Sequence, residues 1–477
     1  MFSEIAVTPL HSTSFWPFVV LAISLVFVIA AISVLRIHAF LALIAAALLA
    51  GILSSRLPDE TGNSAVQHCV RAVELTTSEF GRTAGAIGIA IGLACVIAVC
   101  LMESGAADKV VRRFLAVFGE KQASLALLVS TYVLSIPIFF DTMFLLMLPL
   151  AMTLAMRTRK DYLLYVLAIC AGGVVTHSMT VPHPGPMAMV DNLHIDVGFS
   201  VIAGLVVGIV PAFGGWLVAR RLNISLNLQL RETPGFPWKD LQKSIDRPES
   251  ELPGFFVSIL PVVLPIVLIG GASMVKVLGG PNSAWNIMEF VGNKNIALLV
   301  GAIIATVVMA RVKKMSLRQI GDLMDPPLQT AGIVILITSA GGAFGLMLKN
   351  AGVGDAIQVL AKEHHVNLVI LSYAIALVLR IAQGSATVAM LATSSMIYPI
   401  MIGGALPYHP IYLFLSIGFG AMGVSWMNDS GFWVVSKLTG FTERETLASW
   451  SVLLFAISVI GFVTTLVLSF LLPLKNI

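Results

Sequence analysis

The sequence predicts an all-α polytopic membrane protein of two inverted five-span repeats, each with a re-entrant hairpin and a broken helix. Three observations predict it. Of the 477 residues, 57% are hydrophobic and only 11% are charged, whereas a soluble chain carries roughly 25% charged residues. The apolar residues gather in segments long enough to cross a bilayer, with the basic residues biased toward alternate loops. Short motifs of the first half also recur in the second half.

Most of the apolar sequence falls into segments of about the 20 residues that a helix needs to cross ~30 Å of hydrocarbon. The first, from Pro17 to Leu35, is too long for the core of a signal peptide and is interpreted as a span. We expect a transmembrane helix in each. The segments lie at 17–35, 38–55, 84–103, 162–190, 197–219, 255–275, 296–312, 330–348, 411–437 and 451–472.

Two further apolar stretches, 122–156 and 366–403, are each broken near the middle. The breaks fall at 135–137, which contains a proline, and at 383–385, which contains a glycine. Each half is then marginal in length for a crossing, so we interpret both stretches as re-entrant hairpins. Two short full spans are the alternative, and both interpretations leave the same loops on the same sides.

The basic residues orient these segments. With the N-terminus outside, most of the 29 Lys and Arg residues lie in loops on the inner side, in accord with the positive-inside rule. Both termini are then outside. The polar stretch 223–252 becomes a cytoplasmic linker between two repeats, 15–222 and 253–472, of a single membrane domain that covers residues 1–477.

The two halves resemble each other in sequence. The run 101–108 matches 348–355, the hairpin tips align, and 175–176 matches 424–425, all at nearly the same offset. Because each half has an odd number of spans, the second half must be inverted relative to the first. Inverted repeats with paired broken helices are typical of alternating-access transporters, which hold the substrate near the midplane.

Four polar, irregular stretches interrupt the apolar sequence, at 136–142, 176–186, 380–387 and 425–431. Backbone outside a helix is tolerated at membrane depth only where protein or a water-filled cavity satisfies its polar groups. Each helix that restarts after a break presents free N–H groups and the positive end of its dipole. Converging N-termini favour an anion, so a hydroxylated carboxylate is the expected ligand.

Ionisable residues in these stretches are the sharpest candidates, because a charge at mid-bilayer costs roughly 2.5–3.5 kcal/mol on insertion scales. Arg380 is interpreted as a lone guanidinium suited to a carboxylate, and Asp429 as the proton-coupling group. A structural ion pair is the alternative for both. Asp141 is the main competitor for coupling, or else caps the second hairpin arm. His177 and His183 are candidate proton relays, with a structural role as the alternative for His183.

The other residues of the breaks that carry polar groups or an exposed backbone are predicted to bind the substrate. With His177 and Arg380, this set comprises Thr142, Thr176, Ser178, Gln383, Gly384, Ser385, Thr387, Asn428 and Ser430. Neither a cofactor nor a metal site is predicted, because the four cysteines lack metal-ligand spacing. The net charge of +4 is attributed to membrane topology, and no nucleic-acid partner is expected.

The same stretches resemble those of the gluconate:proton symporter (GntP) family of the ion-transporter superfamily. Residues 176–186 are similar to the family's histidine- and proline-rich break, 382–389 to its second hairpin tip, and 428–433 to its final motif. The resemblance implies inverted repeats, two hairpins, homodimers and proton-coupled uptake of gluconate-like acids, here at the bacterial inner membrane. The chain departs from the family at Trp426, where a histidine is usual, and at 180–182, where a double proline is common.

Other functions stay open at this point. Members of the same family also carry D-serine and other small acids such as glycerate. A membrane-embedded hydrolase would need a base within reach of Ser178 or Ser385, and His177, adjacent to Ser178 in sequence, points away from it in a helix. A passive anion channel could use the same breaks. Uphill uptake driven by a pH gradient separates a symporter from the last two.

Overall fold

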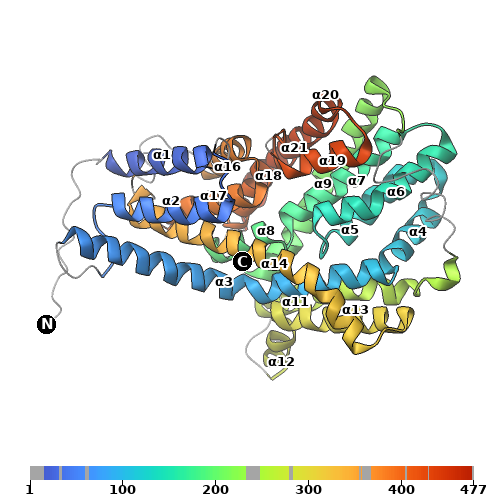
Figure 1. Ribbon diagram of the computed structural model, residues 1–477, viewed down its shortest axis with the longest axis horizontal. Coiled ribbons are helices and arrows are strands. Elements are labelled where there is room, and N and C mark those ends of the chain that lie inside the picture. Colours follow the sequence, from blue (N-terminus) through green and yellow to red (C-terminus); the bar gives the residue numbers. More distant parts are fainter. Residues whose placement is uncertain are drawn as a thin grey trace.

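The computed structural model describes residues 15–31, 35–59, 64–231, 248–278, 283–353, 356, 367–402, 406–427 and 429–474. Within these residues every regular element is a helix. Figure 1 shows an elongated body, with α1, α2 and the start of α3 at one end and α4 and α6 near the other. The prediction of an all-helical chain is confirmed for this part of the sequence.

The helices of the first half run from the N-terminus to the polar linker. They are α1 (Trp16–Ile29), α2 (Ala39–Leu53), α3 (Ala65–Glu103), α4 (Ala106–Phe118), α5 (Ala123–Leu134), α6 (Phe140–Thr158), α7 (Tyr162–Met179), α8 (Pro184–Leu193) and α9 (Val197–Leu226).

The second half contains a comparable series. It comprises α11 (Phe255–Leu278), α12 (Ser283–Val291), α13 (Lys294–Lys313), α14 (Leu317–Asn350), α16 (Leu368–Gln383), α17 (Ala386–Ile402), α18 (Ile411–Met422), α19 (Ser430–Thr439), α20 (Glu443–Thr446) and α21 (Val452–Leu471). A π-helical turn, Leu447–Ser451, joins α20 to α21.

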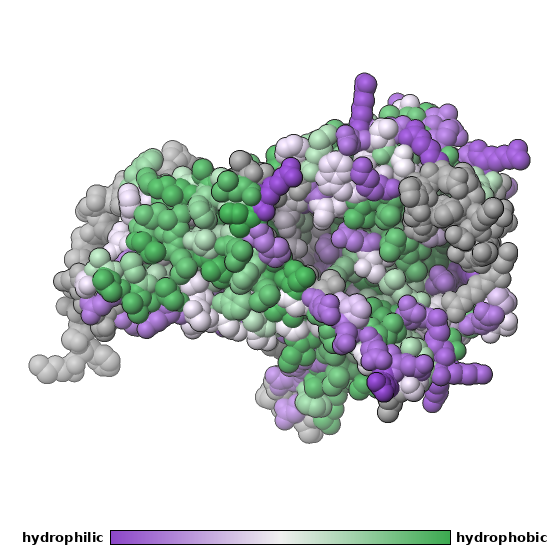
Figure 2. Space-filling view, in the orientation of Figure 1, coloured by the Kyte–Doolittle hydropathy of each residue, from purple (hydrophilic) through white to green (hydrophobic). Residues whose placement is uncertain are grey.

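The surface is that of a membrane protein. Among the described residues, seven helical segments are long and apolar enough to cross a bilayer. Large apolar side chains such as Val26, Leu41 and Ile89 are exposed, and Figure 2 shows a broad apolar surface over the end that α1, α2 and α3 form. An exposed apolar area of this extent marks contact with lipid or with another protein.

Two helices begin well before the predicted spans. In α3, polar residues ahead of the apolar run sustain the helix, with ion pairs from Arg71 to Glu74 (2.9 Å) and from Arg82 to Glu79 (2.6 Å). Such i,i+3 pairs stabilise a helix without adding hydrophobicity. A capping box formed by Ser316 starts α14. Hydropathy detects the apolar part of each helix only.

Each of the four predicted breaks separates two helices: α5 from α6, α7 from α8, α16 from α17, and α18 from α19. Within each half the first broken helix packs on the second, α5 on α7 and α16 on α18, while α8 and α17 pack on each other across the halves. Of an apolar 18-residue stretch within Tyr162–Leu193, 89% is buried. The breaks therefore lie in the interior of the bundle.

Candidate functional site

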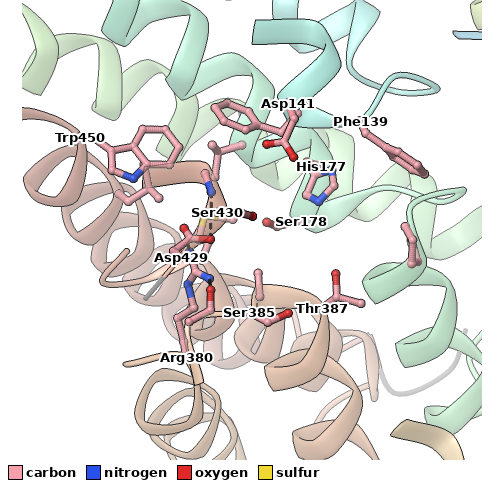
Figure 3. A pocket seen from close by; sticks show the side chains of 18 residues that line it. Phe139, Asp141, His177, Ser178, Arg380, Ser385, Thr387, Asp429, Ser430 and Trp450 are labelled. Atoms are coloured by element: carbon pink, nitrogen blue, oxygen red, sulfur yellow. Dashed lines mark hydrogen bonds and ion pairs between the residues drawn. The ribbon is translucent and has the colours of Figure 1, made fainter. Parts of the chain in front are cut away.

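A cavity of about 490 Å³ lies where the four breaks meet (Figure 3). Helices α6, α8, α17 and α19 begin at its wall, with Phe140, Pro184, Ala386 and Ser430 as their first residues. The predicted convergence of helix N-termini is thus present in the structure. The positive ends of four helix dipoles thus meet at one space, an arrangement that favours a bound anion.

Arg380 and Asp429 form an ion pair at this cavity. The guanidinium donates through Nη2 to Asp429 Oδ2 and through Nη1 to the carbonyl oxygen of Gly384. Both side chains are buried, with 3% and 8% exposed. The interpretation of Arg380 as a lone cation is therefore wrong, because the cation meets a carboxylate that is distant in sequence. The alternative of an ion pair describes the structure.

The Asp429 carboxylate accepts two further hydrogen bonds. Ser425 Oγ donates to Oδ2, and the backbone N–H of Gly431 donates to Oδ1 at 3.2 Å, so Asp429 caps α19. Trp450 Nε1 donates to Ser425 Oγ at 2.7 Å. Charge-assisted bonds of this kind are stronger than neutral ones. The network holds both carboxylate oxygens of Asp429 in place at the cavity.

Gly384 ends α16 in the left-handed region, with φ 77° and ψ −7°. A glycine adopts this conformation without the steric penalty of a Cβ atom. The turn aims the Gly384 carbonyl at Arg380 and brings the start of α17 to the cavity wall. Ser385 Oγ accepts a bond from the backbone N–H of Val388 at 3.3 Å, near the start of α17.

Asp141 faces the cavity from the first turn of α6 and is exposed. No basic side chain of the described residues forms an ion pair with it, and no side-chain capping bond is found at the start of α6. The alternative of a helix-capping role is therefore not observed. In Figure 3 Asp141 and His177 lie on one side of the cavity, and Arg380 and Asp429 lie on another.

The ring of His183 lies next to the ring of His177, farther from the cavity. Their ring centroids are 4.4 Å apart, His177 lines the cavity, and His183 is 1% exposed. His183 Nε2 lies 2.6 Å from the carbonyl oxygen of Ser135 and must donate, because a carbonyl only accepts. Within the described part of the chain, both Nδ1 atoms lack a hydrogen-bond partner. The two histidine rings therefore link the cavity to Ser135, in the break between α5 and α6.

The structure brings most of the remaining predicted residues together: Ser178, Gly384, Ser385, Thr387 and Ser430 line the cavity. Neither Thr142 nor Thr176 does, and the buried Thr176 hydroxyl donates to Tyr132 O at 2.8 Å. Gln383 is the last residue of α16, with its side chain outside the described set, and Asn428 lies outside the described residues.

Sequence reasoning missed the aromatic part of the wall. Phe139, Phe140 and Trp450 line the cavity, and the Phe140 and Trp450 rings lie 5.2 Å apart. The two phenylalanines stand in a predicted break but lack a polar group. Trp450 directly precedes the predicted span 451–472. Its indole N–H, which needs a partner when buried, was the available signal.

The geometry does not support the hydrolase alternative. In the part of the chain that the structure describes, no histidine hydrogen-bonds Ser178 or Ser385, the serines that could serve as nucleophiles. The described residues contain no cluster of three or more His, Cys, Asp or Glu side chains that could hold a metal ion.

Comparison with known proteins identifies the family. Residues 16–471 match the model of the GntP family permeases. The chain is 29% identical to a gluconate permease of Pseudomonas aeruginosa, over 94% of this chain and 97% of the relative. It is 30% identical to the inner membrane permease YgbN of Escherichia coli, over 81% and 86%.

A solved structure shares the fold at low sequence identity. The YdaH transporter of Alcanivorax borkumensis superposes with a TM-score of 0.63 at 13% identity, covering 91% of this chain and 98% of the other. This likeness concerns the fold alone. The family match, by contrast, spans nearly the whole sequence and includes all four breaks. The chain therefore belongs to the GntP family of permeases, as a multi-pass protein of the bacterial inner membrane and not an enzyme.

Proposed function

We propose that the protein is a secondary active transporter that takes up gluconate, or a similar small sugar acid, together with a proton. The observation that carries the proposal is the meeting of four helix N-termini and the Arg380 guanidinium at one cavity. Both features favour an anion. The name gluconate permease, borne by a relative, supports a sugar acid as that anion.

The substrate carboxylate is proposed to take the place of Asp429 on Arg380. In the structure these two residues are paired. A carboxylate that bonds Arg380 instead would leave Asp429 buried without a counter-charge, which is costly. Protonation of Asp429 removes that charge. Binding of a monoanion and binding of a proton therefore favour each other, and the occluded cavity never holds an unpaired charge from this exchange.

The first half is proposed to deliver the proton. Asp141 and His177 line the cavity, and His183 lies against His177. Carboxylate and imidazole groups both exchange protons readily. Ser178, Ser385, Thr387 and Ser430 add hydroxyl groups to the same wall. We propose that these four hydroxyls bond those of the substrate.

Alternating access by two inverted repeats, 15–222 and 253–472, completes the proposal. Its support is the matched order of elements, because a broken helix pair α5–α6 and α7–α8 in one half corresponds to α16–α17 and α18–α19 in the other. The two hairpins and the cytoplasmic linker 223–252 belong to this proposal. So does the homodimer that the family resemblance implies, which native mass spectrometry tests.

Uptake into proteoliposomes tests the function. An inward proton gradient should drive labelled gluconate above its external concentration, and a protonophore should abolish that accumulation. Counterflow with gluconate, glycerate and D-serine ranks the substrates, since another small acid is the runner-up within the same family. Downhill flux without accumulation would instead establish a passive channel, and absence of counterflow for every acid would refute the proposal.

A further inference from the structure

A second cavity, of about 280 Å³, lies at the C-terminal end of α8 and beside the second half of α17. Pro184 of α8 lines the central cavity and Asn192 the second one, while α17 contributes Thr387 and Ser395 in the same way. At 1.5 Å per residue, the two cavities are about 12 Å apart along each helix. Because α8 and α17 pack on each other, they form a partition between the cavities.

Of the two cations that line the second cavity, Arg82 and Lys349, only Arg82 forms ion pairs within the described residues. Arg82 of α3 is occupied, because it pairs with Glu79 at 2.6 Å and with Asp191 at 3.0 Å. Lys349 of α14 lies over the ring of Tyr398, 5.3 Å from its centroid. No carboxylate of the described residues pairs with Lys349, and its side chain is exposed. An anion that enters this cavity therefore meets an ammonium group that makes no ion pair, while the Glu79 carboxylate in the same lining is bonded to Arg82.

The same cavity offers acceptors for hydroxyl groups. Asn192 Nδ2 donates to Ser394 Oγ (2.9 Å) and Ser395 Oγ (3.0 Å), and no described donor reaches its Oδ1. His194 Nδ1 donates to the carbonyl oxygen of Asp191 at 2.8 Å, so Nε2 of the neutral ring is an acceptor. A ligand with one carboxylate and several hydroxyls matches this set of groups.

We propose that the second cavity binds a small hydroxylated carboxylate, held by Lys349 through its carboxylate and by Asn192 and His194 through its hydroxyls. This rests on the proposed function, since the ligand is the solute class of the central cavity. The charge pattern of the sequence places Arg82 and Lys349 outside the membrane core on the outer side. The solute then binds first in this second cavity and moves from there past α8 and α17 to the central cavity.

Equilibrium binding of labelled gluconate to purified protein tests the inference. The wild type should show two classes of site, and Arg380→Gln should keep the weaker class. Adding Lys349→Gln should weaken that residual class roughly tenfold or more, the effect of one lost charge-assisted bond. Adding Leu346→Trp, which fills the cavity from α14 without a change of charge, should have a similar effect. Lys314→Gln, an equal charge change at the exposed end of α13, should have none.

The outcomes separate the two proposals. If Arg380→Gln removes all binding, or if its residual binding withstands both second-cavity substitutions, the second site is refuted while the proposed function stands. If the wild type binds none of the labelled acid, both proposals are refuted for gluconate.

Discussion

The two halves of the chain contribute charged groups with different bonding to the central cavity. In the second half, Arg380 and Asp429 neutralise each other, and Ser425 and Gly431 occupy the remaining carboxylate positions. In the first half, Asp141 has no ion-pair partner among the described residues, and the Nδ1 atom of His177 is unbonded there. One half thus holds charges fixed by bonds, and the other presents ionisable groups free to change partners.

This difference suggests that the second half binds the substrate and the first half exchanges the proton. In the mechanism that we propose, a carboxylate solute displaces an existing bond in the second half, so two carboxylates compete there for one guanidinium. Groups without a partner in the first half can gain or lose a proton without breaking an ion pair. Substitutions on the second-half side should therefore change substrate binding, and those on the first-half side should change proton-driven uptake.

The largest effect is expected at Gly384. Gly384→Val should abolish transport while the protein still inserts, because a β-branched residue is strongly disfavoured at φ 77° and its side chain would project at the cavity. Gly384→Asn is the matched control, since asparagine tolerates the left-handed region, and it should retain part of the activity. Ordinary uptake by the valine variant would mean that this turn lies away from the transport path.

Arg380→Gln should weaken binding of labelled gluconate roughly 100-fold, because it removes a charged donor and leaves Asp429 buried without its partner. The folded yield, measured by size-exclusion chromatography, should fall much less than the affinity. The double variant Arg380→Gln with Asp429→Asn removes the unpaired charge and serves as the control for stability. Normal affinity in the single variant would make Arg380 a structural cation.

Asp141→Asn should leave gluconate affinity within a factor of about two, since the side chain makes no ion pair that a substrate would have to replace. Uptake driven by an inward pH gradient should slow roughly 100-fold, the lower end of the range for a positioned acid–base group. Parallel binding and flux assays measure the two effects. A large loss of affinity with normal pH-driven flux would reverse the assigned roles of the two halves.

The smallest effect is expected at Trp450. Trp450→Phe removes the 2.7 Å bond to Ser425 but keeps an aromatic ring against Phe140. One neutral hydrogen bond contributes about 1 kcal/mol, so affinity should fall about fivefold. Phe140→Leu, which removes the ring contacts of Phe140 and keeps the bond from Trp450 to Ser425, is the matched comparison. Unchanged affinity in Trp450→Phe would show that Ser425 holds Asp429 without this support.

Much of this fold could be predicted, because lipid selects apolar spans and because proline and glycine mark the points where helices break. The polar starts of α3 and α14 were not predictable from hydropathy, since ion pairs and a capping box stabilise them. Within the site, the types of residue were predictable and their partners were not. Arg380 and Asp429 are 49 positions apart, and only the tertiary packing of α16 beside the α18–α19 break brings them together.

We propose above that Asp429 exchanges Arg380 for a proton when the substrate binds. Asparagine at this position mimics the protonated side chain permanently and leaves the guanidinium to the substrate. Asp429→Asn protein should therefore exchange internal for external gluconate but should not accumulate it under a proton gradient. Asp59→Asn, the same chemical change at an exposed carboxylate, should behave as the wild type in both assays.

Reconstituted Asp429→Asn protein, assayed for counterflow and for accumulation in the same vesicles, is the most direct measurement. The account predicts counterflow near the wild-type rate and no accumulation under an inward proton gradient. Accumulation at the wild-type level would contradict it and transfer the proton to Asp141 or His177. Loss of both activities would also contradict it and make Asp429 a binding or structural residue.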